Sequence, residues 1–317
     1  MSSDELIKLW QDASADAPRS EFAILREVEG GFIAASPDET AALIVPLTEA
    51  TVARGRVLGS VRLRYEDALQ FDVDGRSWAQ PAAVIDCLDV ALLRTFSAVI
   101  RDVLGQLRSG KVTAKRVAEA LAAWDDLLRR RTRLDPGGEL GLWGELYLIS
   151  RASSPDTMAS VWRGPHGDTM DFLGGGIALE CKTSARRLRH TISLHQAAFN
   201  GDAVAPHLAS VWACEDATAG KTLPELADEV MSAVVDGAAL LRKLIAVGYR
   251  EEHKSEYERR FSCPSAPVFV RFEHVPRVRA IDDGITNVRY DVDLTRVPIM
   301  GENEALAMLR QLTGDHE

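Results

Sequence analysis

One short segment of the chain combines acidic residues with a lysine at a spacing that suits metal-assisted chemistry. Residues 176–184 read GIALECKTS, a β-like run in which Glu180 and Lys182 stand among apolar neighbours. Side chains at i and i+2 of a strand point to the same face, so these two would lie side by side. Asp171 stands nine residues before Glu180, ahead of three glycines at 174–176. A hairpin at these glycines would bring Asp171 next to Glu180.

Two adjacent carboxylates repel each other unless a cation lies between them. Mg²⁺ suits such a place, because it binds one or two carboxylates and keeps several waters. A metal-bound water has a lowered pKa, and the metal also stabilises negative charge that develops on a phosphate. A neighbouring lysine can orient or deprotonate that water. The combination of Asp171, Glu180 and Lys182 therefore indicates phosphodiester hydrolysis.

The chain contains an internal comparison for this pattern. Of its seven lysines, only Lys182 and Lys254 have an acidic residue two positions earlier. Lys254 lies in REEHKSEYERR, a wholly polar run without strand character. Lys182 lies in an apolar, β-like segment that follows a glycine turn. The alternative interpretation is that Glu180 and Lys182 form a structural ion pair on an edge strand.

The N-terminal part of the chain is predicted to be rich in β-structure. Residues 19–80 read as short strands separated by turn signals such as Gly30-Gly31 and Asp74-Gly75. A short amphipathic helix precedes them, with Leu6, Ile7 and Trp10 on one side. Helical spacing then predicts helices over 84–108, 113–132 and 139–152.

The C-terminal part alternates short strands with helices. The predicted strands lie near 160–163, 169–173, 176–183, 190–194 and 208–214, and later in the segments PVFVRFEHV and TNVRYDVDL. The predicted helices cover about 222–246 and 302–312. We expect the strands from 169 to 214 to form one mixed sheet, with the helices at 139–152 and 222–246 packed on it.

Charge and composition restrict the possible partners. The formal net charge is −10 at pH 7, so the chain as a whole will not coat nucleic acid. DNA contact would need a local basic surface, for which there are two candidates, at 129–133 and at 186–189. No apolar run is long enough for a membrane span. The four cysteines are far apart and form no CxxC pair, which favours a reducing cytoplasm.

Four segments in this order resemble the PD-(D/E)xK nuclease superfamily, and within it a bacterial family of PD-(D/E)xK motif proteins found among defence genes. The segments are GLWGELYLI at 141–149, VWRGP at 161–165, Asp171-Phe172, and LECKT at 179–183. The residue before Asp171 is Met170, where the motif name has proline, a position that varies widely in the superfamily.

The resemblance implies an α/β fold: a restriction-endonuclease-like mixed sheet flanked by helices, with an N-terminal β-rich layer. We place a domain boundary near residue 110. Residues 1–110 would form the β-rich region ending in a helix, and 111–317 the nuclease-like domain, although the helix at 84–108 could belong to either side. The implied function is that of a Mg²⁺- or Mn²⁺-dependent DNA endonuclease, the cleaving component of a bacterial restriction or phage-defence system. Its expected partners are DNA and other defence proteins or a second copy of the chain.

The resemblance also extends the set of site residues. The metal would be held by Asp171, Glu180 and the backbone carbonyl of Cys181. Glu145 would face it from the first core helix, and Gln196 would contact the phosphate or Lys182. Glu145 could instead be a solvated helix residue, and Gln196 a helix cap.

Three arginines directly follow the proposed catalytic strand and are candidates for phosphate contacts: Arg186, Arg187 and Arg189. A solvated face is the alternative for them. Trp143 and Trp162 are expected to be core residues. Two other functions stay open: a nuclease-fold protein that binds DNA or assembles without catalysis, and an unrelated β-rich adaptor.

Overall fold

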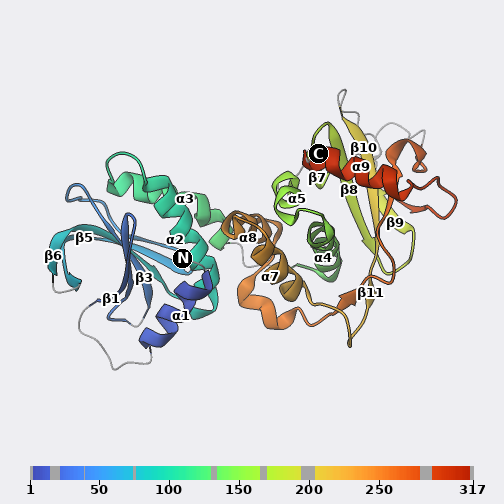
Figure 1. Cartoon of the computed structure of the whole chain (residues 1–317). Coiled ribbons are helices and arrows are strands. Elements are labelled where there is room, and N and C mark those ends of the chain that lie inside the picture. The colour runs from blue at the N-terminus through green and yellow to red at the C-terminus, as the bar shows by residue number, and fades with distance from the viewer. Residues whose placement is uncertain are drawn as a thin grey trace. The chain divides into compact units, whose positions relative to one another are not determined.

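The computed structural model describes residues 3–14, 22–38, 40–73, 76–129, 134–164, 170–193, 204–278 and 288–314 (Figure 1). The chain forms two compact units. The first comprises Met1–Thr132 with Arg250–Glu252, and the second comprises Arg133–Tyr249 with His253–Glu317. No helix within the described ranges is both long and apolar enough to cross a membrane.

The first unit is built on an antiparallel sheet, as predicted for the N-terminal layer. Its six strands follow the order β1-β2-β3-β6-β5-β4. Their bounds are β1 Ala23–Val28, β2 Gly31–Ala35, β3 Ala41–Pro46, β4 Arg56–Leu58, β5 Val61–Val73 and β6 Arg76–Cys87. The helices are α1 Ser3–Ser14, α2 Leu93–Leu107 and α3 Ala114–Arg129, with a short 3-10 helix at Val90–Leu92.

Two boundaries in this unit differ from the sequence predictions. The helix predicted over 84–108 begins at Leu93, and residues 84–87 are the end of β6. Strand β6 pairs with β3 on one side and β5 on the other, and these ladders override the local helical spacing. The compact unit also extends to Thr132, past the boundary placed near 110, because α3 packs on α2, β4 and β5.

The second unit is a mixed α/β structure around a four-stranded sheet of order β13-β10-β8-β7. Strands β8 and β10 are parallel, and the other neighbours are antiparallel. The strands are β7 Phe172–Gly174, β8 Ile177–Ser184, β9 Arg189–Ser193, β10 Ala205–Trp212, β11 Cys214–Glu215, β12 Phe261–Ser262, β13 Val268–Arg271 and β14 Arg289–Asp293. The helices are α4 Pro136–Arg151, α5 Pro155–Val161, α7 Leu223–Ala233, α8 Gly237–Val247 and α9 Glu302–Thr313, with 3-10 turns at Glu251–Glu256 and Phe272–His274.

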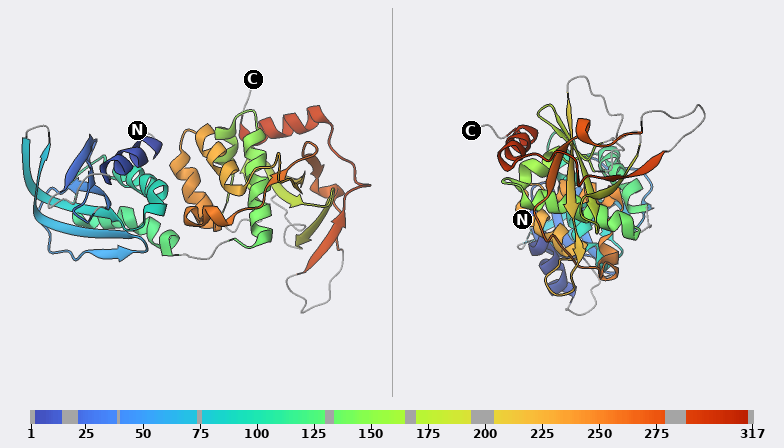
Figure 2. Two further views of the ribbon diagram at one scale, coloured as in Figure 1. Left: turned by 90° about the horizontal axis from the view of Figure 1, so that it is seen from below. Right: turned by 90° about the vertical axis from the view of Figure 1, so that its right-hand side faces the viewer.

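Three predictions for this unit were wrong in detail. The strand expected near 160–163 is the end of α5, followed by a single bridge between Trp162 and Phe172. The helix expected over 222–246 is two helices, because Asp236 caps α8 by accepting a hydrogen bond from the Ala239 N–H. Strand β9 pairs with β14 in a separate two-stranded ribbon, which Figure 2 shows at the side of the unit.

The hairpin of β7 and β8 has the register that the sequence predicts. Phe172 pairs with Leu179, and Gly174 pairs with Ile177. Gly175 and Gly176 form the turn with φ values of +52° and +75°, in the left-handed region that favours glycine. Helix α9 lies against this turn, where the Gln311 side chain donates a hydrogen bond to the Gly175 carbonyl at 2.9 Å. A turn of two glycines therefore sets the pairing of β7 with β8.

Helix α4 approaches β8 at a glycine. It begins at Pro136, after Asp135 accepts a capping hydrogen bond from the Gly138 N–H at 2.7 Å. A Cβ atom at Gly144 would lie only 1.8 Å from Oγ1 of Thr183 on β8. The missing side chain therefore permits the contact that places Glu145, the next residue, beside the β7–β8 hairpin.

Substituting this glycine tests the close approach. Gly144→Ala should lower the free energy of unfolding by about 1–3 kcal/mol, because the added methyl group forces helix and strand apart. Gly141→Ala on the same helix is the matched control, since no atom lies within 4 Å of its added Cβ. It should raise stability by up to about 1 kcal/mol through helix propensity. Denaturant unfolding of both variants measures this, and equal effects would contradict the packing described.

Candidate active site

The hairpin places Asp171 beside Glu180, as the spacing predicts. Oδ2 of Asp171 accepts a hydrogen bond from the backbone N–H of Cys181 at 2.7 Å. The carbonyl of Asp171 accepts another from the N–H of Arg163 at 2.7 Å. The half-buried carboxylate thus lies against the backbone of β8, between the two charged residues of the strand.

Glu180 and Lys182 share one face of β8 and form an ion pair. Nζ of Lys182 lies 2.7 Å from Oε1 of Glu180. The side chain of Glu180 is only 3% exposed, whereas that of Lys182 is 22% exposed. The ammonium group of Lys182 therefore lies against a buried carboxylate, while part of the lysine side chain is open to solvent. A structural pair requires this contact, whereas a catalytic pair requires only that the two side chains share one face of the strand.

Glu145 faces the same place from α4. Its Oε2 accepts a hydrogen bond from the indole N–H of Trp162 at 2.7 Å. Burial raises the pKa of Glu145 well above its usual range, and the negative charges of Asp171 and Glu180 raise it further. The Trp162 hydrogen bond and the charge of Lys182 oppose that rise. Three carboxyl groups, from α4, from the residue before β7 and from β8, therefore influence one another electrostatically.

Asp171 and Cys181, which the hydrogen bond across the hairpin joins, also have shifted pKa values. Burial raises the pKa of Asp171, and the Cys181 N–H and the Lys182 charge act against it. Burial, followed by the charges of Asp171 and Glu145, raises the pKa of the Cys181 thiol well above its usual range. This thiol stays protonated at neutral pH and is unsuited to act as a nucleophile.

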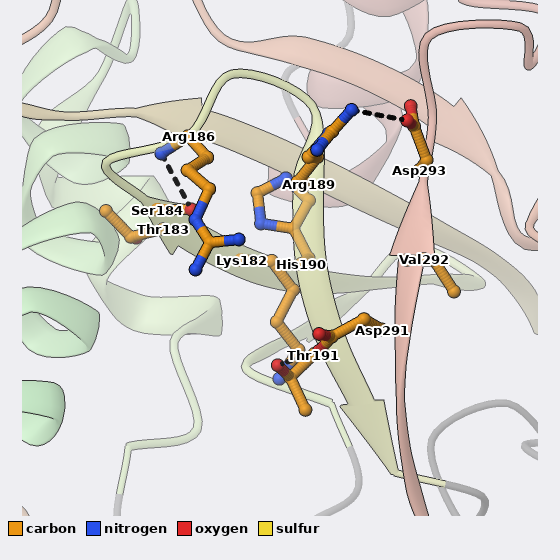
Figure 3. A pocket seen from close by; sticks show the side chains of 10 residues that line it. All are labelled: Lys182, Thr183, Ser184, Arg186, Arg189, His190, Thr191, Asp291, Val292 and Asp293. Carbon is orange, nitrogen blue, oxygen red and sulfur yellow. Dashed lines mark hydrogen bonds and ion pairs between the residues drawn. The ribbon is translucent and has the colours of Figure 1, made fainter.

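A cleft of about 480 Å³ opens beside Lys182 (Figure 3). Its lining comes from the end of β8, the following turn, β9 and β14, and consists of Lys182, Thr183, Ser184, Arg186, Arg189, His190, Thr191, Asp291, Val292 and Asp293. Arg186 and Arg189 are exposed on its rim, and Arg189 pairs with Asp293 at 3.2 Å. The third arginine, Arg187, instead lies over the ring of Trp212, 5.8 Å from its centre.

His190 is a residue of this site that the sequence analysis did not select. It is buried, and its Nε2 lies 2.7 Å from Oγ of Ser210, which pairs with Lys182 across β8 and β10. Burial and the charge of Lys182 lower the pKa of His190 to about 4, so the ring is neutral at pH 7. The sequence does contain a signal for this burial. His190 and Ile192 are alternate residues of a strand and point to the same, buried face.

Trp162 was expected to be a core residue and is fully buried. Its hydrogen bond to Glu145 could not be predicted from the sequence, because it joins two elements 17 residues apart. Gln196 lies outside the described residues, as do Arg130, Arg131 and Arg133.

The donor groups at the hairpin fit a hard divalent cation in kind. Asp171 and Glu180 supply carboxylate oxygens, and β8 supplies backbone carbonyls. Within the described part of the chain, no three His, Cys, Asp or Glu side chains are grouped closely enough to hold a metal ion. A site with two carboxylates and several waters is the arrangement that Mg²⁺ commonly takes. The donor atoms therefore suit such a site in kind, and Glu145 is not grouped with them as a third ligand.

The fold and the site together define a mixed α/β protein with an acid–turn–acid-x-lysine hairpin. A family model described as "Putative PD-(D/E)XK family member, (DUF4420)" matches residues 31–295, which covers most of both units. The chain belongs to this family. No curated protein and no solved structure matches it.

The raised pKa of Glu145 predicts how stability depends on pH in metal-free buffer. The folded state binds this proton more tightly than the unfolded state. The resulting stabilisation is complete below the ordinary glutamate pKa of about 4.3 and is lost as the pH rises through the higher folded-state value. Glu145→Gln removes this dependence and keeps an acceptor for Trp162. Its melting temperature should exceed that of the wild type at pH 7, by a margin that shrinks towards pH 4. Thermal unfolding with EDTA measures this, and a variant that melts lower at pH 7 contradicts it.

Proposed function

We propose that this protein is a Mg²⁺- or Mn²⁺-dependent DNA endonuclease of the PD-(D/E)xK type. One observation carries the proposal: Asp171, Glu180 and Lys182 lie together on one hairpin, and Lys182 lines a cleft that Arg186 and Arg189 also line. In this proposal, the four-stranded sheet with α4 packed on β8 is a restriction-endonuclease-like core. Membership of the family supports a nuclease, and the arginines on the rim support a nucleic-acid substrate.

The residues of the hairpin have separate roles in this scheme. Asp171 and Glu180 hold the cation, together with the Cys181 carbonyl. A bound divalent cation lowers the pKa of its water and stabilises charge on the phosphate. Lys182 extends from Glu180 into the cleft, where its ammonium group can orient the attacking water.

Arg186 and Arg189 are placed to contact DNA phosphates at the rim of the cleft. Because the chain carries a net charge of −10, a local cationic edge is needed to attract a polyanion. Arg189 already pairs with Asp293, so a phosphate would compete with that carboxylate. Arg187 lies over the ring of Trp212 instead of lining the cleft, so it is the least suited of the three arginines to contact a phosphate there.

A second function is a DNA-binding or assembly subunit without catalysis. The ion pair of Lys182 with Glu180 favours it, because a lysine bound to a carboxylate at 2.7 Å also fits a purely structural role. The lack of a three-residue metal group among the described residues points the same way. The complete set of Asp171, Glu180 and Lys182 favours catalysis, since a binding subunit does not need all three.

The biological setting proposed is a bacterial restriction or phage-defence system, on the strength of the family resemblance. The first unit carries none of the candidate site residues, and it is the part assigned to docking a partner protein or a second copy of the chain. An isolated chain that cut specific DNA sites tightly as a monomer would refute this assignment.

Substitution of Lys182 separates the two functions. If Lys182 acts on the attacking water, Lys182→Ala should lose plasmid nicking by about 10² or more and keep its DNA affinity. Lys182→Arg should not restore nicking, because arginine cannot act as a base and has a planar head. Lys254→Ala is the matched control. Lys254 also follows an acidic residue by two positions, but it pairs with Asp228 at 3.1 Å.

Nicking rates with Mg²⁺ or Mn²⁺ and melting temperatures are measured on the same samples. A structural ion pair predicts the opposite pattern for Lys182→Ala: a lower melting temperature, partial recovery with arginine, and unchanged nicking. That result, or a wild type without any nicking activity, would overturn the catalytic proposal.

A further inference from the structure

The indole of Trp162 makes a directed contact with the candidate site. Trp162 is fully buried between α5 and β7, and its N–H donates to Oε2 of Glu145 at 2.7 Å. An indole N–H can donate a hydrogen bond but cannot accept one, so Trp162 is the donor and Glu145 the acceptor in either protonation state of Glu145. The acceptor is the one carboxyl group of α4 whose electrostatic environment includes both Asp171 and Glu180.

The backbone and ring of Trp162 are themselves held in place. Its backbone bridges to Phe172 at the start of β7. Nζ of Lys243 on α8 donates to the Trp162 carbonyl at 2.5 Å and to the Ala159 carbonyl at 3.1 Å. The same ammonium group lies 5.8 Å from the centre of the indole ring. The donor therefore has little freedom to follow Glu145 if that side chain moves.

We propose that Trp162 is a positioning residue that holds the Glu145 carboxyl group towards Asp171 and Glu180, so that the site binds a divalent cation. This inference rests on the proposed function and assigns a residue to it. Two neighbouring carboxylates would push an unanchored glutamate away. A fixed donor opposes that repulsion and keeps the third carboxyl group in reach of the cation's waters. Groups that do not touch a metal themselves, but form hydrogen bonds around its site, orient the metal's ligands and tune the affinity for the metal.

Two other tryptophans provide matched controls. Trp143 lies on the same helix as Glu145 and is also buried, but its N–H donates to the carbonyl of Lys221 at 3.0 Å. Trp124, in the first unit, donates to Oδ2 of Asp102 at 3.0 Å, which makes it an indole–carboxylate pair outside the candidate site. Replacing each tryptophan with phenylalanine removes a buried N–H donor and keeps an aromatic ring.

The experiment measures Mn²⁺ affinity by calorimetry, together with melting temperature in EDTA. Trp162→Phe should weaken Mn²⁺ binding by about tenfold or more, the usual effect of losing a group that orients a metal site. Trp143→Phe and Trp124→Phe should keep wild-type affinity, whatever they do to the melting temperature. A purely structural role for Trp162 predicts equal affinity in all three variants.

A double-mutant cycle tests whether Trp162 acts through Glu145. Glu145→Gln should itself weaken Mn²⁺ binding, and adding Trp162→Phe to it should cause little further loss. Independent losses that multiply would overturn the inference. If the wild type binds no Mn²⁺, the proposed function fails and this inference fails with it. If the wild type binds Mn²⁺ and Trp162→Phe binds it equally well, only this inference fails.

Discussion

The candidate site depends on one hydrogen bond, from the backbone N–H of Cys181 to the carboxylate of Asp171. This bond places Asp171, the residue before β7, against the strand that carries Glu180 and Lys182. A slip of one residue in the pairing of β7 and β8 would turn the side chains of β8 to the opposite faces. The two-residue glycine turn prevents such a slip, and α9 packs on the turn from outside. Chemistry at the hairpin therefore relies on elements that carry no charged site residue.

Three acidic groups around one lysine are an unfavourable arrangement in a partly buried place. The raised pKa values of Glu145 and Asp171 express that cost, because each folded-state carboxyl group prefers to keep its proton. A cation between them would remove the repulsion. Sites of this kind commonly lower the stability of a fold. The role proposed for Trp162 is to supply a fixed hydrogen-bond donor against this repulsion.

Much of this arrangement could be predicted from the sequence, because the decisive information is local. The glycine turn, the β-like segment and the alternation of Glu180 with Lys182 together specify a hairpin and a shared face. The same holds for α4, whose capping residue Asp135 and helical spacing lie close together in the chain. Local patterns failed where tertiary contacts determine the secondary structure. Residues 84–87 have helical spacing but form the end of β6, which pairs with a strand on each side.

The contacts made by Trp162 and His190 lay beyond sequence reasoning for a similar reason. Each depends on a partner from another element, Glu145 on α4 and Ser210 on β10. The separation of β9 from the central sheet was equally hidden, because strand propensity does not specify which strand is the neighbour. Hydrophobic spacing shows that a residue is buried but not which polar atom its side chain meets.

The proposed function requires a divalent cation bound between Asp171 and Glu180. A crystal structure of the protein with Mn²⁺, measured at the manganese absorption edge, tests this requirement. We expect one strong anomalous peak in contact with both carboxylates. Lys182 should either leave Glu180 or share the Glu180 carboxylate with the metal. The peak should be lost in Asp171→Asn crystals grown in the same way. A map without a peak at the hairpin, with the Lys182–Glu180 pair unchanged at saturating Mn²⁺, would contradict the proposed function.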